Sequence, residues 1–172
     1  MSLINPLHKA VFDGDCGKID ALLVGGDANI KTRLEKWNLL HMALIGVTDA
    51  PNPHTVRHLV GIGVDVNAKD YCGWTPLHFA ARVKGRAADP ACSTVCVKLL
   101  VDAGADVNAE TNEGITPLHE SILKYPWNMD LTEVLLAAGA KKTSIFEGFV
   151  NAVAGPDKEE LLKQLHKYQP SV

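Results

Sequence analysis

The sequence predicts an all-α solenoid of stacked helix-turn-helix units, and two regularities carry that prediction. The motif Pro-Leu-His, or once Leu-Leu-His, occurs four times in the 172 residues, with the histidines at positions 8, 41, 78 and 119. A glycine at 26, 63 or 104 stands 15 residues before each of the last three histidines. Self-similarity with a period of 20 to 50 residues is typical of stacked repeats, each of which packs on its neighbours.

The first helix of each repeat is predicted to begin at the Leu-His motif. Thr75 and Thr116 each stand before a proline, which is the arrangement of a helix N-cap followed by proline at the first helical position. Asn5-Pro6 repeats this arrangement, and Asn38 is an equivalent cap. We therefore expect four helices to begin at these residues.

The second helix of each repeat is predicted from apolar residues at helical spacing, followed by a glycine that ends the helix. The apolar groups are Ile19, Leu22 and Leu23; Val56, Leu59 and Val60; Val97, Leu100 and Val101; and Leu131, Leu135 and Leu136, and the glycines are Gly26, Gly63, Gly104 and Gly139.

The C-terminal segment is predicted to form two short helices that cap the stack. Residues 144–147 and 157–160 both have the pattern of a capping box. Leu161, Leu162 and Leu165 lie on one face of the second helix, and its other face is charged. A terminal repeat needs such a polar outer side.

The motifs resemble those of the ankyrin repeat family. The third repeat reads Gly-Trp-Thr-Pro-Leu-His at 73–78, the fourth reads Gly-Ile-Thr-Pro-Leu-His at 114–119, and Ala-Asp-Val-Asn-Ala occurs at 105–109. The pattern weakens at the ends, where Leu39 replaces the motif proline and Phe149 stands where a fifth histidine would fall. The resemblance implies β-hairpin-like finger loops and one domain, 1–172. Its expected parts are repeat one (5–37), repeat two (38–74), repeat three (75–115), repeat four (116–142) and a cap (143–168).

Composition excludes several classes of function. The 17 basic and 20 acidic residues give a net charge of -3 without a basic stripe, so nucleic acid is a poor partner. No apolar run is long enough to span a membrane, and the start lacks the pattern of a signal peptide. The four cysteines are too few and too irregular for a disulfide framework. We expect a cytoplasmic monomer with reduced thiols.

Three insertions relative to repeat one, of 4, 8 and 2 residues, fall between the helices of repeats two, three and four. They lie around 49–53, 84–90 and 125–128. Equivalent loops of stacked repeats share an edge, so the insertions are expected to lie together. They are either neutral loops, which are tolerated cheaply, or a second contact surface.

The resemblance also implies which residues contact a partner, since ankyrin proteins typically bind through the finger and the exposed side of the first helix. Trp37 and Trp74 occupy equivalent positions, and with Tyr71 and Ile115 they would form one apolar patch. Alternatively, each indole covers the neighbouring hairpin. The predicted partner-binding residues are Leu34, Glu35, Trp37, Tyr71, Cys72, Trp74, Asn112, Glu113 and Ile115.

We expect no catalytic residue, cofactor or metal. The resemblance implies that the four motif histidines hydrogen-bond backbone near the finger and join repeats. His54 and His58, and Cys92 and Cys96, have a spacing that places ligands on one helix face, but a metal site needs a complete ligand set. No nucleophile elbow or phosphate-binding glycine loop occurs.

The predicted function is therefore protein binding, as a stand-alone adaptor or inhibitor. Neutralisation of a bacterial toxin by an immunity protein is an alternative. A metal-dependent protein or enzyme that uses the His and Cys pairs, and a structural scaffold without a single partner, are further alternatives.

Overall fold

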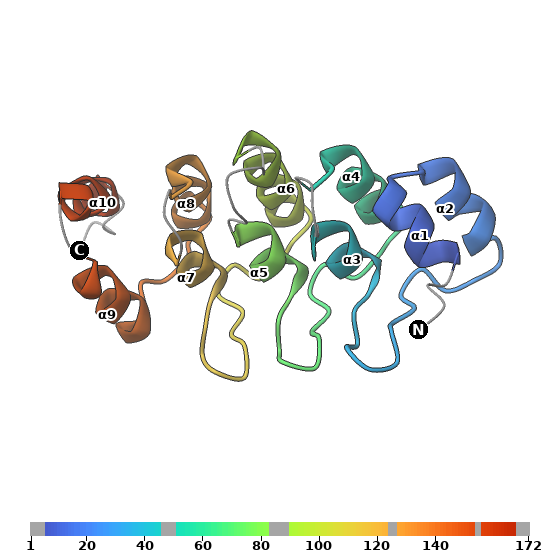
Figure 1. The fold of residues 1–172 in the computed structure, drawn as a ribbon, viewed down its shortest axis with the longest axis horizontal. Helices are drawn as coiled ribbons and strands as arrows, with labels where there is room; N and C mark the ends of the chain where they lie inside the picture. Colours follow the sequence, from blue (N-terminus) through green and yellow to red (C-terminus); the bar gives the residue numbers. More distant parts are fainter. Residues whose placement is uncertain (1–5, 46–50, 83–89, 124–126, 154–155, 168–172) are drawn as a thin grey trace.

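The computed structural model describes residues 6–45, 51–82, 90–123, 127–153 and 156–167, and within them the chain forms helices and no strand. The helices form two rows (Figure 1), with the odd-numbered helices in the inner row and the even-numbered ones in the outer row. Their bounds are α1 Pro6–Asp13, α2 Cys16–Leu23, α3 Leu39–Ile45, α4 Pro53–Gly61, α5 Pro76–Ala81, α6 Pro90–Asp102, α7 Pro117–Ile122, α8 Met129–Ala137, α9 Ser144–Ala152 and α10 Pro156–Lys167.

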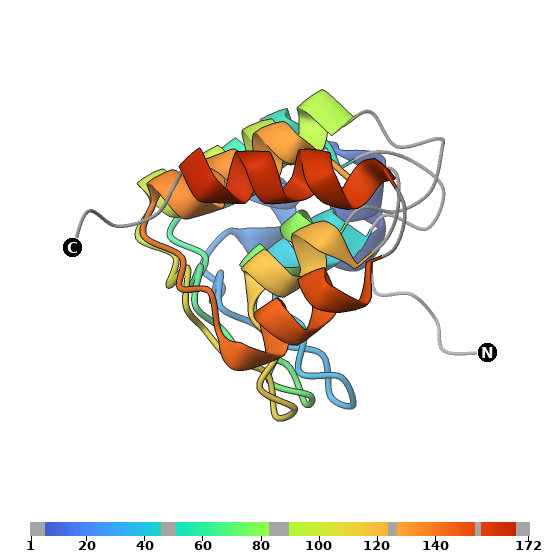
Figure 2. The ribbon, with the colours of Figure 1, turned by 90° about the vertical axis from the view of Figure 1, so that its left-hand side faces the viewer.

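Each helix pair packs on the next along the stack. In the inner row α1 packs on α3, α3 on α5 and α5 on α7, and in the outer row α4 packs on α6 and α6 on α8. Figure 2, viewed from the C-terminal end, shows the outer row above the inner row and the helices of each row one behind the other, with the loops that link successive pairs to the side of and below them. The all-α solenoid expected from the sequence is confirmed.

The helix starts follow the predicted caps, with two corrections in the C-terminal cap. Thr75 and Thr116 are N-caps with proline at the first helical position, and the Thr116 hydroxyl accepts the backbone N–H of His119. In the cap, Ser144 was expected to begin a capping box, but the hydroxyl that accepts the N–H of Phe146 belongs to Thr143. The N-cap therefore lies one residue earlier, and Ser144 is the first residue inside α9. Helix α10 begins at Pro156, so Asp157, the first residue of the second predicted capping box, lies inside the helix.

The core is one continuous cluster of mainly aliphatic side chains, contributed by both rows of helices. Leu40, Leu77 and Leu118 are fully buried at equivalent positions of the inner row, and the second helices bury their apolar faces against them. Leu22 differs from the expectation because it is 45% exposed. Its helix, α2, stands at the N-terminal end of the outer row, where no earlier repeat covers it (Figure 1).

Glycine ends the second helices in the left-handed region, where the absence of a Cβ removes the steric cost. Gly63, Gly104 and Gly139 have φ angles of 85°, 87° and 90°. In repeat one the left-handed residue is Gly25, with φ 71°, and not the predicted Gly26.

An asparagine joins each repeat to the next just after this glycine. The Asn67 side chain donates to the carbonyl of Gly104 (3.0 Å) and accepts the N–H of Asp106 (2.8 Å). Asn29 makes the same two bonds to Gly63 and Asp65, and Asn108 makes them to Gly139 and Lys141. We call these three residues and their partners the asparagine ladder.

The insertions fall largely on 46–50, 83–89 and 124–126, which lie outside the described residues. A second contact surface made by the three loops therefore stays a prediction.

Candidate functional site

Three finger loops project below the inner row (Figure 1), and we call them together the finger row. The first finger is 30–37, the second 68–74 and the third 109–115. A backbone hydrogen bond closes each one: Thr32 N–H to Trp37 O (2.8 Å), Asp70 N–H to Trp74 O (2.9 Å) and Thr111 N–H to Ile115 O (2.9 Å).

Backbone hydrogen bonds also join neighbouring fingers. The N–H of Tyr71 donates to the carbonyl of Glu35 (2.9 Å), and the N–H of Asn112 donates to the carbonyl of Cys72 (3.0 Å). The Asn112 side chain adds a bond to the carbonyl of Tyr71 (3.2 Å). The finger row is therefore one hydrogen-bonded unit rather than three independent loops.

One position in each finger requires a left-handed backbone. Gly73 and Gly114 hold it in the second and third fingers, with φ 82° and 75°, and Lys36 holds it in the first, with φ 62°. A Cβ at Gly73 would lie 2.9 Å from the backbone N of Asn112. Glycine at 73 thus permits both the turn and the close approach of the third finger.

The motif histidines join each inner helix to the following finger. His78 Nδ1 accepts the N–H of Thr75 (3.1 Å), so this nitrogen carries no proton, and Nε2 donates to the carbonyl of Ile115 (3.0 Å). His41 Nδ1 lies 3.2 Å from the backbone N of Asn38 and 2.7 Å from the Asn38 side-chain oxygen. His41 Nε2 donates to the carbonyl of Trp74 (3.0 Å). We call the hydrogen bonds of His41 and His78 the histidine ladder, with each histidine as one rung.

Burial favours the neutral form of both rings of the histidine ladder. Desolvation lowers the pKa of His78 to about 4 and also lowers the pKa of His41. At His78 a neutral ring is required, since a protonated Nδ1 could not accept the N–H of Thr75.

His119 departs from this pattern. Its ring is fully buried, yet neither ring nitrogen makes a hydrogen bond of good geometry in the part of the chain that the structure describes. Burial lowers the pKa of His119, and only a weak interaction with the backbone of Ile145 raises it. Edge-on contacts to Phe146 (5.9 Å between centroids) and Phe149 (5.7 Å) surround the ring instead. The segment that follows repeat four is too short to form a finger, because Thr143 comes only four residues after Gly139.

Aromatic side chains cluster where the first two fingers meet α5. Phe79 lies edge-on to Trp37 (6.0 Å between centroids) and to Trp74 (5.4 Å). The Trp37 indole N–H also donates to the Asp70 carboxylate (3.2 Å). Both indoles are half-buried and pack against the core. They therefore help to cover Phe79 of α5. Their contact with a partner stays a prediction.

Arg82 completes this region and was not anticipated from the sequence. Its guanidinium lies over the Trp74 ring, 5.3 Å from the centroid, and its Nε is 3.8 Å from a carboxylate oxygen of the buried Glu120. Phe79 was also missed, although its place directly after the motif histidine is a usable signal, because that position faces the fingers.

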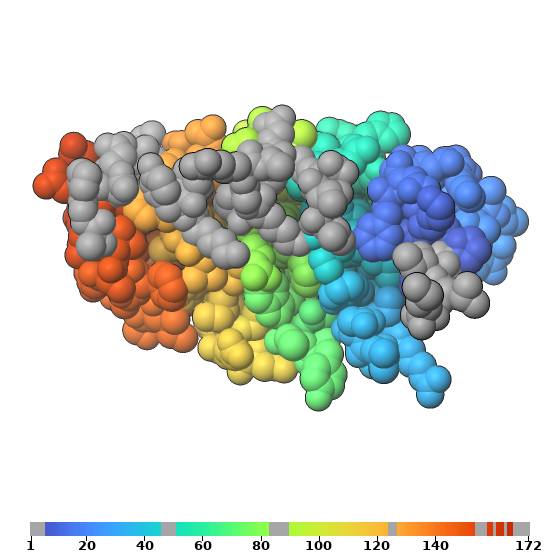
Figure 3. Space-filling view, in the orientation of Figure 1, coloured from blue at the N-terminus to red at the C-terminus, as the bar shows by residue number. Residues whose placement is uncertain are grey.

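The exposed apolar surface lies at the finger tips. Leu34 and Tyr71 are each 77% exposed and occupy equivalent positions in the first two fingers. The tips form the lower rim of the space-filling view (Figure 3). Of the other predicted binding residues, Glu35, Cys72, Asn112 and Glu113 are exposed, and Ile115 is half-buried.

Charge changes sign along the finger row. The first finger carries Lys31, Arg33 and Lys36 against the single acid Glu35, and all four are exposed. The second finger carries one residue of each sign. The third carries only the exposed acids Glu110 and Glu113. A partner that lies along the row therefore meets a basic end and an acidic end.

The remaining candidate ligands lie elsewhere. All four cysteines are free thiols, and Cys96 is buried. Within the described ranges, no three His, Cys, Asp or Glu side chains lie close enough together, as they stand, to hold a metal ion. No helix in these ranges combines the length and the apolar character needed to cross a membrane.

Comparison with known families agrees with the geometry. The family model described as ankyrin repeats (3 copies) matches residues 7–88 and again 48–145, which together cover most of the sequence. The chain belongs to the ankyrin repeat family. No curated protein matched the chain closely enough to serve as a relative. Ankyrin repeats are protein–protein interaction modules and are typically not catalytic.

Proposed function

We propose that this ankyrin-repeat protein binds a partner protein through the finger row and the adjoining inner helices, and acts as an adaptor or as an inhibitor without catalysing a reaction. The observation that carries the proposal is the pair Leu34 and Tyr71. Two large side chains with apolar surface occupy equivalent positions in neighbouring fingers, and both are 77% exposed. Solvent gives them no stabilisation there, whereas burial against a partner would.

The finger row suits binding because it is already ordered. Finger-to-finger backbone bonds at Glu35 and Cys72 fix the loops relative to one another. The histidine ladder ties the second and third fingers to the inner helices. An ordered surface loses little conformational entropy when it binds, so more of the contact energy appears as affinity.

Charge along the row favours one orientation of the partner. An acidic patch would face the basic first finger, and a basic patch would face Glu110 and Glu113. Such complementarity raises the association rate and weakens with salt. Neutralisation of a toxin would be one form of inhibition by this surface, and the identity of the captured partner decides that point.

The test compares exposed finger variants with a matched exposed control. Leu34→Ala and Tyr71→Ala should each weaken partner binding by about 2 kcal/mol, roughly 30-fold in affinity. Val24→Ala removes an aliphatic side chain that is 84% exposed after α2 and should leave affinity unchanged. The partner is captured from native lysate and identified by mass spectrometry, and affinities are then measured with the purified pair.

Trp37→Ala and Trp74→Ala should weaken binding at least as much, but they also uncover Phe79, so their stability must be measured alongside. Trp127 belongs to the insertion edge, and the finger-row proposal expects Trp127→Ala to bind normally. Loss of binding by Trp127→Ala, with Leu34→Ala and Tyr71→Ala unaffected, would place the partner on the insertion edge and refute the site.

A further inference from the structure

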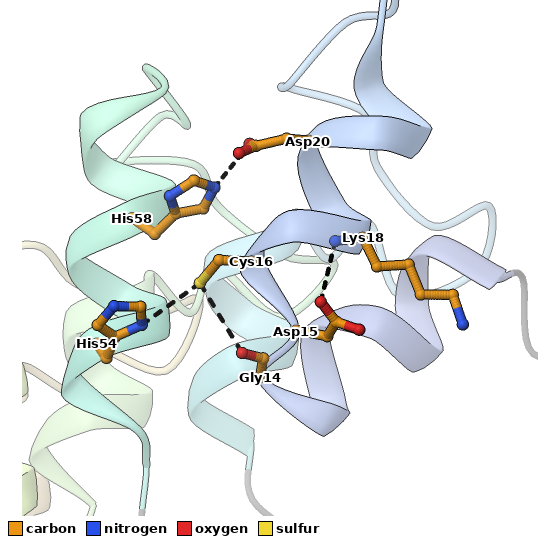
Figure 4. A network of polar contacts seen from close by, with 7 residues as sticks. All are labelled: Gly14, Asp15, Cys16, Lys18, Asp20, His54 and His58. Atoms are coloured by element: carbon orange, nitrogen blue, oxygen red, sulfur yellow. Dashed lines mark hydrogen bonds and ion pairs between the residues drawn. The ribbon is translucent and has the colours of Figure 1, made fainter.

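Two neighbouring outer helices bring four metal-ligating side chains face to face (Figure 4). Cys16 and Asp20 stand one helical turn apart on α2, and His54 and His58 stand one turn apart on α4. The Sγ of Cys16 lies 3.5 Å from Nδ1 of His54, and Nε2 of His58 lies 2.7 Å from a carboxylate oxygen of Asp20. Neither pair belongs to the finger row.

The spacing of the first pair matches two ligands of one zinc ion. With Zn–S near 2.3 Å and Zn–N near 2.0 to 2.1 Å, tetrahedral geometry separates the two ligand atoms by about 3.5 to 3.6 Å. Histidines four positions apart on a helix bind one zinc ion in a well-known helical motif, and His54 and His58 have that spacing.

The second pair can turn toward the same ion. His54 and Asp20 are exposed, and His58 is half-buried. As they stand, the four side chains form two pairs and do not converge on one point. A common site therefore requires the His58 ring to turn from its bond with Asp20 toward His54.

The local charge favours a cation, because the carboxylates of Asp20 and Asp15 act electrostatically on the Cys16 side chain. A bound zinc ion displaces the thiol proton. Sulfur and imidazole ligands select zinc over magnesium or calcium.

We propose that Cys16, His54 and His58 bind one Zn²⁺, with Asp20 as the fourth ligand, and that the ion clamps repeat one onto repeat two. Such a clamp would strengthen the outer side of the joint, where α2 buries only Ile19 completely. In the described residues α4 packs closely on α6 and α6 on α8, whereas α2 packs closely on α1 alone. The clamp is independent of partner binding at the finger row.

The test is titration of the metal-free protein with Zn²⁺ and Co²⁺. The wild type should bind one equivalent with a dissociation constant of about 1 µM or tighter, and Co²⁺ should give the thiolate-to-metal absorption band. Cys16→Ser should abolish the band, and Cys16→Ser and His58→Ala should each weaken Zn²⁺ binding by at least about tenfold. Cys72→Ser removes an exposed finger thiol as the matched control and should change neither readout.

Folding is monitored separately, by thermal melting without metal. His54→Gln alters an exposed side chain and provides a second variant that should lose the same affinity. Zn²⁺ should also slow hydrogen exchange in α1 and α2 of the wild type but not of Cys16→Ser. The proposal is wrong if the wild type does not bind Zn²⁺ in this range, if Cys16→Ser or His54→Gln binds as tightly as the wild type, or if hydrogen exchange in repeat one is unchanged.

Discussion

Two sets of hydrogen bonds join the repeats: the asparagine ladder, at the turns after the second helices (the outer edge), and the histidine ladder, at the fingers (the inner edge). The two ladders differ at the C-terminal end. The asparagine ladder continues into the cap, where Asn108 bonds to Gly139 and Lys141 as its counterparts do further back. The histidine ladder stops one repeat earlier, because His41 and His78 each donate to a carbonyl of the next finger, whereas His119 makes no well-formed hydrogen bond in the described chain and interacts only weakly with the backbone of Ile145.

The difference follows from where each partner lies in a repeat. The asparagine needs only the turn after a second helix, and the cap keeps that turn at Gly139. The histidine needs the carbonyl of the last residue of the next finger, such as Trp74 or Ile115, and the cap has no finger. A terminal unit can therefore lose its finger and still be held at the outer edge, while the inner edge loses polar bonds and relies on Phe146 and Phe149.

Acid should weaken the histidine ladder selectively and have the largest effect. Histidine in the unfolded chain titrates near pH 6.5, whereas His78 titrates near 4 in the fold. Between these values the unfolded state binds more protons, so stability falls as the pH falls. His78 alone should contribute a loss of roughly 3 kcal/mol by about pH 4, and the lowered pKa of His41 adds to it.

The measurement is urea unfolding between pH 7.5 and 4, with His78→Gln as the control. Carboxylates titrate in both proteins, so the difference in slope isolates the imidazole. A wild-type slope as shallow as that of His78→Gln would contradict the prediction.

The next largest effect on stability should be that of His78→Ala, and it should exceed the effect of His119→Ala. His78→Ala removes a ring bonded on both sides and leaves the carbonyl of Ile115 and the N–H of Thr75 without that partner, at a cost of roughly 2 to 3 kcal/mol. His119→Ala should cost less, because it breaks no such bond to a following finger. Chemical denaturation of both variants tests the order, and equal losses would show that packing alone sets the contribution of these rings.

Removal of one rung of the asparagine ladder should have a smaller effect. Asn67→Ala loses bonds to Gly104 and Asp106, but Asn67 is exposed and water can replace its side chain. We expect a loss of about 1 kcal/mol, and about the same for Asn108→Ala at the cap. A much larger loss for Asn67→Ala, measured by the same unfolding experiment, would mean that the outer edge dominates cohesion of the stack.

The smallest effect should be a gain within the finger row. Lys36 is the one non-glycine residue with a positive φ in the described chain, at the position held by Gly73 and Gly114 in the other fingers. Lys36→Gly should raise stability by roughly 0.5 to 1 kcal/mol through relief of backbone strain. The opposite change, Gly73→Ala, should destabilise, since its Cβ would meet the backbone of Asn112. Thermal melting of both variants checks the sign.

Local motifs predicted most of the fold because they act within a few residues. The capping threonines Thr75 and Thr116 each fix a helix start by a bond to a residue three positions later, and such bonds are visible in sequence. The error at Ser144 arose because Thr143 and Ser144 are both good caps, and only the observed hydrogen bond separates them.

The candidate site was predictable in position but not in exposure. The repeat register placed Trp37, Trp74, Leu34 and Tyr71 on the fingers, and the structure places them there. Which of them face solvent depends on Phe79 of α5, because both indoles pack against its ring and are half-buried there. Contacts between repeats of this kind, like the meeting of Cys16 with His54, join residues far apart in sequence and follow no local pattern.

The asparagine ladder makes the repeats interchangeable parts. Gly63, Gly104 and Gly139 offer the same carbonyl in the same backbone conformation, and each is met by an asparagine from the preceding unit. A chain in which repeat three was copied in tandem would find a matching donor and acceptor at the new junction. The cap would cover the last repeat of the longer array as it does here. Duplication of a repeat could therefore lengthen the stack without changing the contacts between neighbouring repeats.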